Sequence, residues 1–260
     1  MIIDFHTHAF PDAVAEKAIP RLEKVGNITA HTMGTVDALL ASMDNAGIEK
    51  SLICSIATRP EQFEAILDWS CAIRSQRIIP LPSIHPDDPD CVKHIQRVKE
   101  EGFIGIKMHP YYQEYLLADE RLNDFYAALS ENELLLVAHC GFDIGFPRTR
   151  CADPAQIAQL LSNFPKLRFI ATHFGGWKLW DEVEEQLIGR EIFMEVSFAL
   201  KYLEKEQVKR MIRNHPADYL LFGSDSPWDD QKECLRQLEQ LSLGSDLFTK
   251  ITETNALQLL

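Results

Sequence analysis

The chain has 260 residues, of which 46% are hydrophobic and 25% are charged. This is the composition of an ordinary globular protein, and it excludes disordered, collagen-like and low-complexity classes. Acidic residues outnumber basic ones by 39 to 26, which gives a formal net charge of −13. Such a charge disfavours nucleic acids and anionic membranes as partners.

The sequence contains six cysteines without a C-x-x-C pair, and no apolar stretch reaches the length of a membrane span. It opens with MIIDFHTH, which lacks the basic leader of a secretory signal. We therefore expect reduced cysteines, a cytoplasmic location and no membrane partner.

Short aliphatic and β-branched runs alternate with segments of helical spacing along the whole chain. The runs that predict strands are 2–5, 52–57, 78–84, 103–108, 134–139, 167–173, 192–197 and 219–223. The segments that predict helices are 36–46, 61–75, 89–101, 122–131, 154–164, 179–188, 205–214 and 231–241. Eight such units predict an α/β fold, a single-domain (β/α)8 TIM barrel over residues 1–260.

The stretch from Ala9 to Thr35 is too long for an ordinary connection between a strand and a helix. We interpret it as an insertion after the first strand, with a short helix near 14–25. It is expected to lie over the mouth of the barrel, where the carboxyl ends of the strands bring functional groups together.

Histidine, aspartate or lysine occurs at the ends of five of the eight predicted strands. These residues are His6 and His8 on the first strand, Lys107 on the fourth, His139 on the fifth, His173 on the sixth and Asp225 on the eighth. Residues two apart on a strand face the same way, so His6 and His8 can share one metal ion. Closure of the barrel brings Asp225 to the same point. Imidazoles and a carboxylate are typical of a catalytic divalent metal site, and zinc is the expected ion.

A metal ion in this position lowers the pKa of its bound water to about 7. Asp225 can bind the ion and accept a proton from that water. His173 can either bind a second ion or serve as a general acid and base. Lys107 has two interpretations that the sequence leaves open. As an ammonium it suits a substrate carboxylate or phosphate, and as a carbamate formed with CO2 it bridges two metal ions.

In order and spacing these residues resemble the amidohydrolase superfamily, and more narrowly its amidohydrolase-related branch, or amidohydrolase family 2. The stretches GIKMHP at 105–110, THFGG at 172–176 and FGSDSPW at 222–228 add to the resemblance, which covers nearly the whole chain. Members of this branch hydrolyse amides, lactones and esters, or decarboxylate unsaturated and aromatic acids.

The resemblance implies one of two metal arrangements. In the decarboxylases a single ion is held by His6, His8, His139 and Asp225, and His173 is the acid and base. In two-metal members a carboxylated Lys107 bridges the ions and His173 binds the second one.

We therefore expect a metal-dependent hydrolase of a small-molecule amide, lactone or ester that uses metal-activated water. Non-oxidative decarboxylation of an unsaturated or aromatic acid at a mononuclear site is the alternative. A phosphoesterase that also begins with D-x-H-x-H would need a late Asp-x-His pair, and Asp225 is followed by Ser226 and Pro227. A metal-binding barrel without chemistry is disfavoured by the complete set of ligands.

Substrate contacts are less clear from the sequence. Arg148 and Arg150 lie in the long segment after the fifth strand, and arginine binds a carboxylate through two donors. With Lys107 they are the candidates for holding an acidic substrate. Glu195 on the seventh strand is expected to point into the site or to pair with a buried cation. By analogy with the family we expect a monomer or a homodimer.

Overall fold

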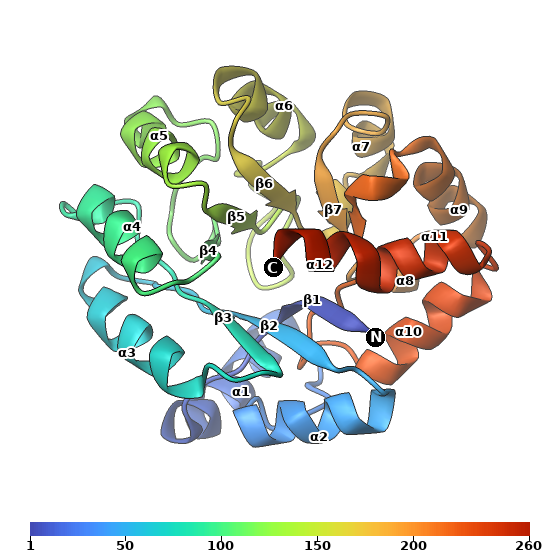
Figure 1. Ribbon diagram of the computed structural model, residues 1–260, viewed down its shortest axis with the longest axis horizontal. Helices are drawn as coiled ribbons and strands as arrows, with labels where there is room; N and C mark the ends of the chain where they lie inside the picture. The colour runs from blue at the N-terminus through green and yellow to red at the C-terminus, as the bar shows by residue number, and fades with distance from the viewer.

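Eight parallel strands alternate with helices along the computed structural model, which describes residues 1–260 (Figure 1). The strands are β1 Ile3–Thr7, β2 Lys50–Cys54, β3 Ile78–Leu81, β4 Gly105–Met108, β5 Leu135–Ala138, β6 Arg168–Ala171, β7 Phe193–Glu195 and β8 Leu220–Leu221. They pair in chain order within two sheets, β1 to β3 and β4 to β8. β1 extends two residues beyond its predicted end, whereas the other seven strands are shorter than predicted, because the polar residues that follow several of them leave the ladder to form turns.

Backbone hydrogen bonds connect the two sheets at both of their edges. The amide of Lys107 in β4 donates to the carbonyl of Pro82, directly after β3, over 2.9 Å. The amide of Phe5 in β1 donates to the carbonyl of Phe222, directly after β8, over 2.8 Å. The strands thus follow one another around a ring, and the chain has the predicted TIM-barrel fold.

The eight predicted helices are all present, close to their predicted bounds. They are α2 Val36–Ala46, α3 Phe63–Ile73, α4 Cys91–Glu100, α5 Asn123–Glu131, α6 Pro154–Asn163, α7 Trp180–Gln186, α9 Lys205–Asn214 and α10 Gln231–Gln240. Figure 1 shows them around the outside of the strands. The insertion after β1 contains the predicted helix, α1 Asp12–Gly26. None of the helices combines the length and the apolar composition needed to cross a membrane.

Apart from short 3-10 turns, four helical segments were not predicted. They are α8 Ala199–Tyr202, α11 Ser245–Thr249, a π-helical turn at Lys250–Thr254 and α12 Asn255–Leu259. Figure 1 shows α12 lying across the ring of strands. Its residues Ala256 and Leu259 pack against a buried cluster that includes Phe5, Leu135 and Leu221. This apolar cluster fills the inside of the barrel, and a larger one fills the space between the strands and the outer helices.

Asp4 ties β1 to the segment that follows β8 and to α10. Its fully buried carboxylate accepts hydrogen bonds from the amide and hydroxyl of Ser224, from the side chain of Gln231 and from the amide of His6. The pairing of β1 with β2 also shifts in register between Asp4 and Thr7. Because of this irregularity the side chains of the adjacent residues Phe5 and His6 both make contacts inside the barrel, Phe5 in the apolar cluster and His6 with Lys107.

We expect Asp4→Asn to lower the free energy of unfolding by about 1–3 kcal/mol, because an amide nitrogen would face buried donors that the carboxylate now satisfies. Urea denaturation followed by circular dichroism measures this change. Asp68→Asn on the exposed surface of α3 is the control. Equal stability of the two variants would contradict a role for Asp4 in closing the ring.

Candidate functional site

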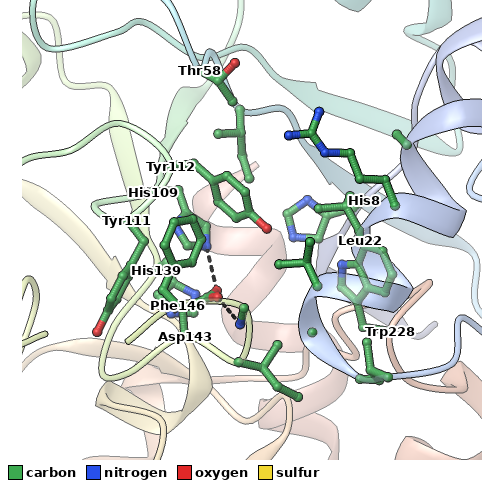
Figure 2. A pocket seen from close by; sticks show the side chains of 18 of the residues that line it. His8, Leu22, Thr58, His109, Tyr111, Tyr112, His139, Asp143, Phe146 and Trp228 are labelled. Carbon is green, nitrogen blue, oxygen red and sulfur yellow. Dashed lines mark hydrogen bonds and ion pairs between the residues drawn. The ribbon is translucent and has the colours of Figure 1, made fainter. Parts of the chain in front are cut away.

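A cavity of about 910 Å³ lies at the carboxyl ends of the strands, and its lining includes His8, His139, His173 and Asp225. This volume is within the usual range for small-molecule sites. Figure 2 shows His8 and Trp228 on one side of the cavity, with His109, His139 and Asp143 on the other. The strand ends therefore bring several of the predicted residues to one hollow.

The first group of predicted ligands consists of His6, His8 and Asp225. The Nε2 atoms of His6 and His8 lie 3.1 Å apart. Asp225 Oδ1 lies 3.4 Å from His6 Nε2 and 3.1 Å from His8 Nε2. The predicted convergence of the first and eighth strands is thus present in the geometry.

The second group consists of His139 and His173, which lie against each other. His139 Nδ1 and His173 Nε2 are 3.0 Å apart. The metal-competent group of His6, His8 and Asp225 does not include His139. Binding of His139 to the same ion as His6 and His8, as in the single-ion arrangement, therefore stays a prediction.

Each of these four histidines uses one ring nitrogen for a partner outside the centre. His6 Nδ1 donates to Glu195 Oε1 over 2.9 Å, and His8 Nδ1 donates to the carbonyl of Cys54 over 2.7 Å. His139 Nε2 donates to the carbonyl of Phe142 over 3.0 Å. Such outer hydrogen bonds fix the tautomer and the orientation of a metal-binding imidazole. In a neutral ring they leave the lone pair on the nitrogen that faces the centre.

The tautomer of His173 follows from its contact with Ser197. The Ser197 hydroxyl donates to Glu195 Oε1 over 2.9 Å, so its oxygen accepts from His173 Nδ1, also over 2.9 Å. His173 Nε2 is then an acceptor that faces the acceptor nitrogen of His139. Two lone pairs at this distance repel each other unless a cation lies between them.

Burial sets the charge state of the centre. It lowers the pKa of the His6, His139 and His173 imidazoles well below 6.5, so these rings are neutral at pH 7. It also raises the pKa of Asp225 above its usual value. Neutral imidazoles and a nearby carboxylate are the donor set that a divalent metal ion takes, so the residues present fit the predicted metal.

Lys107 lies inside this centre and is fully buried. Its Nζ is 3.0 Å from His6 Nε2, and no carboxylate lies within ion-pair distance of it. An unpaired ammonium in a buried position is costly. This unpaired position of Lys107 therefore calls for a bound partner or a chemical conversion of the amine.

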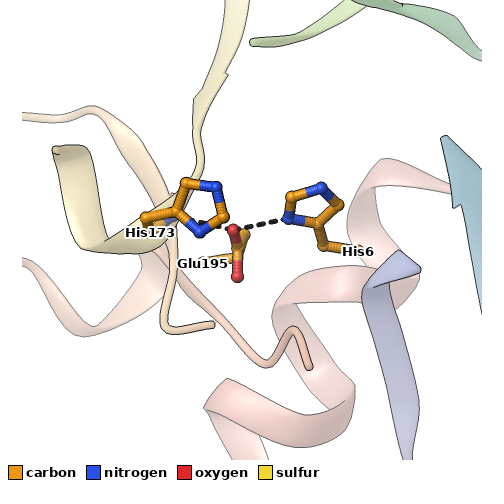
Figure 3. A group of neighbouring side chains, drawn as sticks. All are labelled: His6, His173 and Glu195. Atoms are coloured by element: carbon orange, nitrogen blue, oxygen red, sulfur yellow. Dashed lines mark hydrogen bonds and ion pairs between the residues drawn. The ribbon is translucent and has the colours of Figure 1, made fainter. Parts of the chain in front are cut away.

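Glu195 points into the site, as one of its two predicted orientations requires. Figure 3 shows its carboxylate between His6 and His173. It accepts from the amide of His173 over 2.8 Å and from the amide of Ser197 over 2.7 Å, while burial raises its pKa to about 7. Gly223 makes room for it, since a Cβ there would lie 2.2 Å from Glu195 Oε2.

Two of the predicted ligands have a strained backbone. His173 has φ of 56° and Asp225 has φ of 64°, in the left-handed region that non-glycine residues seldom adopt. Such conformations cost on the order of 1–3 kcal/mol each and gather at functional sites. The strain supports a functional role for both residues.

His109 and Asp143 are site residues that were not among the predicted ligands. The rings of His109 and His139 stack with centroids 4.1 Å apart, and Asp143 Oδ2 lies 3.4 Å from His109 Nε2. His109 follows Lys107 by two residues, so strand alternation offered a signal for it. Asp143 lies in an irregular loop, where the sequence offered none.

The predicted substrate arginines do not line the cavity. Arg150 pairs with Asp153 and Glu182 through its guanidinium. Arg148 lies over the ring of Phe142 at 5.4 Å from its centroid. The cations that do line the cavity are Lys17 and Arg21 of α1. Sequence reasoning missed them because they belong to the insertion rather than to a strand end.

We expect the buried histidines to lower the stability of the metal-free protein as the pH falls below 6.5, against the opposite effect of Asp4 and Glu195, whose pKa values are raised. In this pH range the histidines of the unfolded chain become protonated. In the folded protein four buried histidines stay neutral because their pKa values are lowered, namely His6, His109, His139 and His173. Each such imidazole contributes up to about 1.4 kcal/mol of unfolding free energy per pH unit. Urea titrations from pH 7.5 to 5 should show a shallower slope for His109→Gln. His31→Gln, which changes an exposed ring, is the control, and identical slopes would contradict the assignment.

Solved structures with the same fold cover nearly the whole chain. An uncharacterized TIM-barrel protein from Bordetella bronchiseptica is 19% identical with a TM-score of 0.81, over 99% of this chain and 97% of its own. The 5-carboxyvanillate decarboxylase LigW from Sphingomonas paucimobilis is 12% identical with a TM-score of 0.77, over 99% and 98%. A 5-carboxyvanillate decarboxylase from Novosphingobium aromaticivorans, solved with manganese, is 14% identical with a TM-score of 0.72, over 100% and 96%. At these identities the likeness shows the fold alone.

No protein of curated function matches the sequence. A family model described as amidohydrolase matches residues 3–260, which is nearly the whole chain. The match agrees with the order of the strand-end residues and with the resemblance drawn from them. The chain belongs to the amidohydrolase family.

Proposed function

We propose that the protein is a metal-dependent hydrolase of a small-molecule amide, lactone or ester. The observation that carries the proposal is the set of four outer hydrogen bonds, which turn four imidazole acceptors toward the centre. These acceptors form two close pairs, His6 with His8 and His139 with His173. Two pairs support two divalent ions, and zinc is the ion we propose.

One ion would be held by His6, His8 and Asp225, and the second by His139 and His173. Bound divalent ions supply an activated water and polarise the carbonyl that is attacked. Asp225 is the residue placed to accept a proton, since its carboxylate touches the first group and lines the cavity. Glu195 and Ser197 act as positioning residues, because Glu195 accepts a hydrogen bond from His6 Nδ1 and Ser197 accepts one from His173 Nδ1.

Lys107 would complete the centre as a carbamate. Its neutral amine attacks CO2, a C–N bond forms, and one proton leaves for solvent. The resulting anion would offer two carboxylate oxygens beside the imidazole of His6. Its deep burial and the lack of an acidic partner support this state over a free ammonium.

Decarboxylation of an aromatic acid is the second candidate. The cavity wall favours it, because Tyr111, Tyr112, Phe146 and Trp228 line the space together with two cations. In this case one ion is expected and Lys107 remains an unmodified side chain beside His6. His173 would then act as the acid and base by first accepting a proton on Nε2 and then passing it to the ring carbon that loses CO2.

Metal analysis of the purified protein separates the two candidates. Two ions per chain are expected, and Lys107→Met should bind at most one because the bridging anion is lost. Bicarbonate should restore activity to metal-depleted wild type on reconstitution but should have no effect on the variant. Inductively coupled plasma mass spectrometry gives the stoichiometry. One ion per chain in the wild type would favour the decarboxylase.

Asp225→Asn should lower kcat by about 100-fold or more, since a proton acceptor is typically worth two to four orders of magnitude. The assay follows acid release from aromatic esters and lactones, and in parallel CO2 release from hydroxybenzoates. Asp68→Asn is the control for general effects of the exchange. Unchanged turnover in Asp225→Asn would overturn the proton role, and CO2 release alone would overturn the hydrolase.

A further inference from the structure

The segment that follows β4 forms an anchored turn at the edge of the cavity. The side chain of Gln113 in this turn is fully buried, and its amide group donates to the carbonyls of Ala57 over 3.1 Å and Ile84 over 3.0 Å. Its Oε1 accepts from the backbone amide of His109 over 2.7 Å. Gln113 therefore fixes the backbone of the turn to the segments that follow β2 and β3, and with it the position of the neighbouring Tyr112.

The ring of Tyr112 is held on two sides. It packs edge-on against the ring of His109 at 4.7 Å and against the ring of Phe146 at 4.8 Å between centroids. Its hydroxyl forms no hydrogen bond within the protein, although Tyr112 lines the cavity. The adjacent Tyr111 differs, because its hydroxyl donates to the carbonyl of Thr149. Tyr112 thus presents a polar group in a fixed position without a protein partner.

The hydroxyl of Tyr112 faces the cavity as a hydrogen-bond donor. Figure 2 shows it pointing toward the side of the cavity that carries His8. Burial, together with the carboxylates of Asp143 and Asp225, raises the pKa of Tyr112 above its usual value, so the phenol keeps its proton at neutral pH. The effect of Asp225 also places the phenol within electrostatic reach of the first group of metal ligands.

The four histidines of the centre supply no such donor. Their outer hydrogen bonds turn lone pairs, rather than N–H groups, toward the space where a substrate would react. When water attacks the carbonyl of an ester, lactone or amide, a C–O bond forms and an electron pair moves onto the carbonyl oxygen. A donor that is already aimed at this oxygen stabilises the new charge more strongly than it stabilises the neutral substrate.

We propose that Tyr112 is a catalytic residue whose hydroxyl donates a hydrogen bond to the oxygen that becomes negative during hydrolysis. The phenol keeps its proton throughout, and the proton of the attacking water goes to Asp225. This role accounts for a side chain that is anchored through Gln113, held between two rings and left without a partner. The inference rests on the proposed function, since it takes the attacked carbonyl to lie at the four histidines.

The test compares Tyr112→Phe, which removes only the hydroxyl, with the wild type. Phenylphosphonate is the inert probe, because its tetrahedral oxyanions resemble the state that the hydroxyl is expected to bind. Isothermal titration calorimetry of the metal-loaded proteins should give a Kd about tenfold or more higher for the variant, as expected for the loss of a hydrogen bond to a charged group. On the ester that the wild type hydrolyses best, kcat should fall by about 100-fold or more while KM changes little.

Tyr219→Phe is the matched control, because it removes the same group from a tyrosine outside the cavity, whose hydroxyl donates to Glu191. An unchanged Kd or an unchanged kcat in Tyr112→Phe would overturn the role of Tyr112. So would an equal loss in Tyr219→Phe, or a wild type that does not bind phenylphosphonate. Metal content is measured on the same samples, which separates loss of the hydroxyl from loss of the ions. A wild type that hydrolyses no ester, lactone or amide, but whose phosphonate binding still depends on Tyr112, would count against the proposed function alone.

Discussion

The site depends on the hydrogen bonds that hold the four histidines from outside. Their acceptors come from different parts of the ring: Cys54 from β2, Glu195 from β7, Ser197 from the turn after β7 and Phe142 from the loop after β5. His6 and His8, at the end of the first strand, are therefore held from two different sides of the barrel, His6 by Glu195 of β7 and His8 by Cys54 of β2. Closure of the ring is thus a condition for the geometry of the site and not only for stability.

Burial shifts the pKa values of the imidazoles and of the carboxyls in opposite directions, and both shifts disfavour the charged form of the group. Imidazoles lose their protons more easily there, whereas Glu195 and Asp225 hold theirs more strongly. The hydrogen bonds to Glu195 oppose the effect of burial on that carboxyl. The protonation of these groups would therefore depend on whether a cation is bound beside them.

Much of the fold could be predicted from the sequence, because strands and helices alternate regularly along the chain. The helices α2 and α9 have the predicted bounds. His6 and His8 were readable for a similar reason, since both stand at the end of one strand. The irregular pairing near Asp4 was not, because it depends on contacts with Ser224 and Gln231 that are distant in sequence. The ion pair of Arg150 with Glu182 could not be foreseen either, because the two residues lie 32 positions apart. The C-terminal helices lack alternation with a strand, so the repeat gave no signal for them.

The helix α1 lies in the insertion after β1 and is not one of the eight helices that alternate with the strands. It nevertheless contributes Lys17, Arg21 and several apolar side chains to the lining of the cavity. The reactive groups, by contrast, are fixed to the strands and to one another. The surface that α1 contributes to the cavity and the strand-end histidines thus belong to separate stretches of the sequence. A change within residues 12–26 would alter the lining of the cavity while leaving the residues that position the histidines in place.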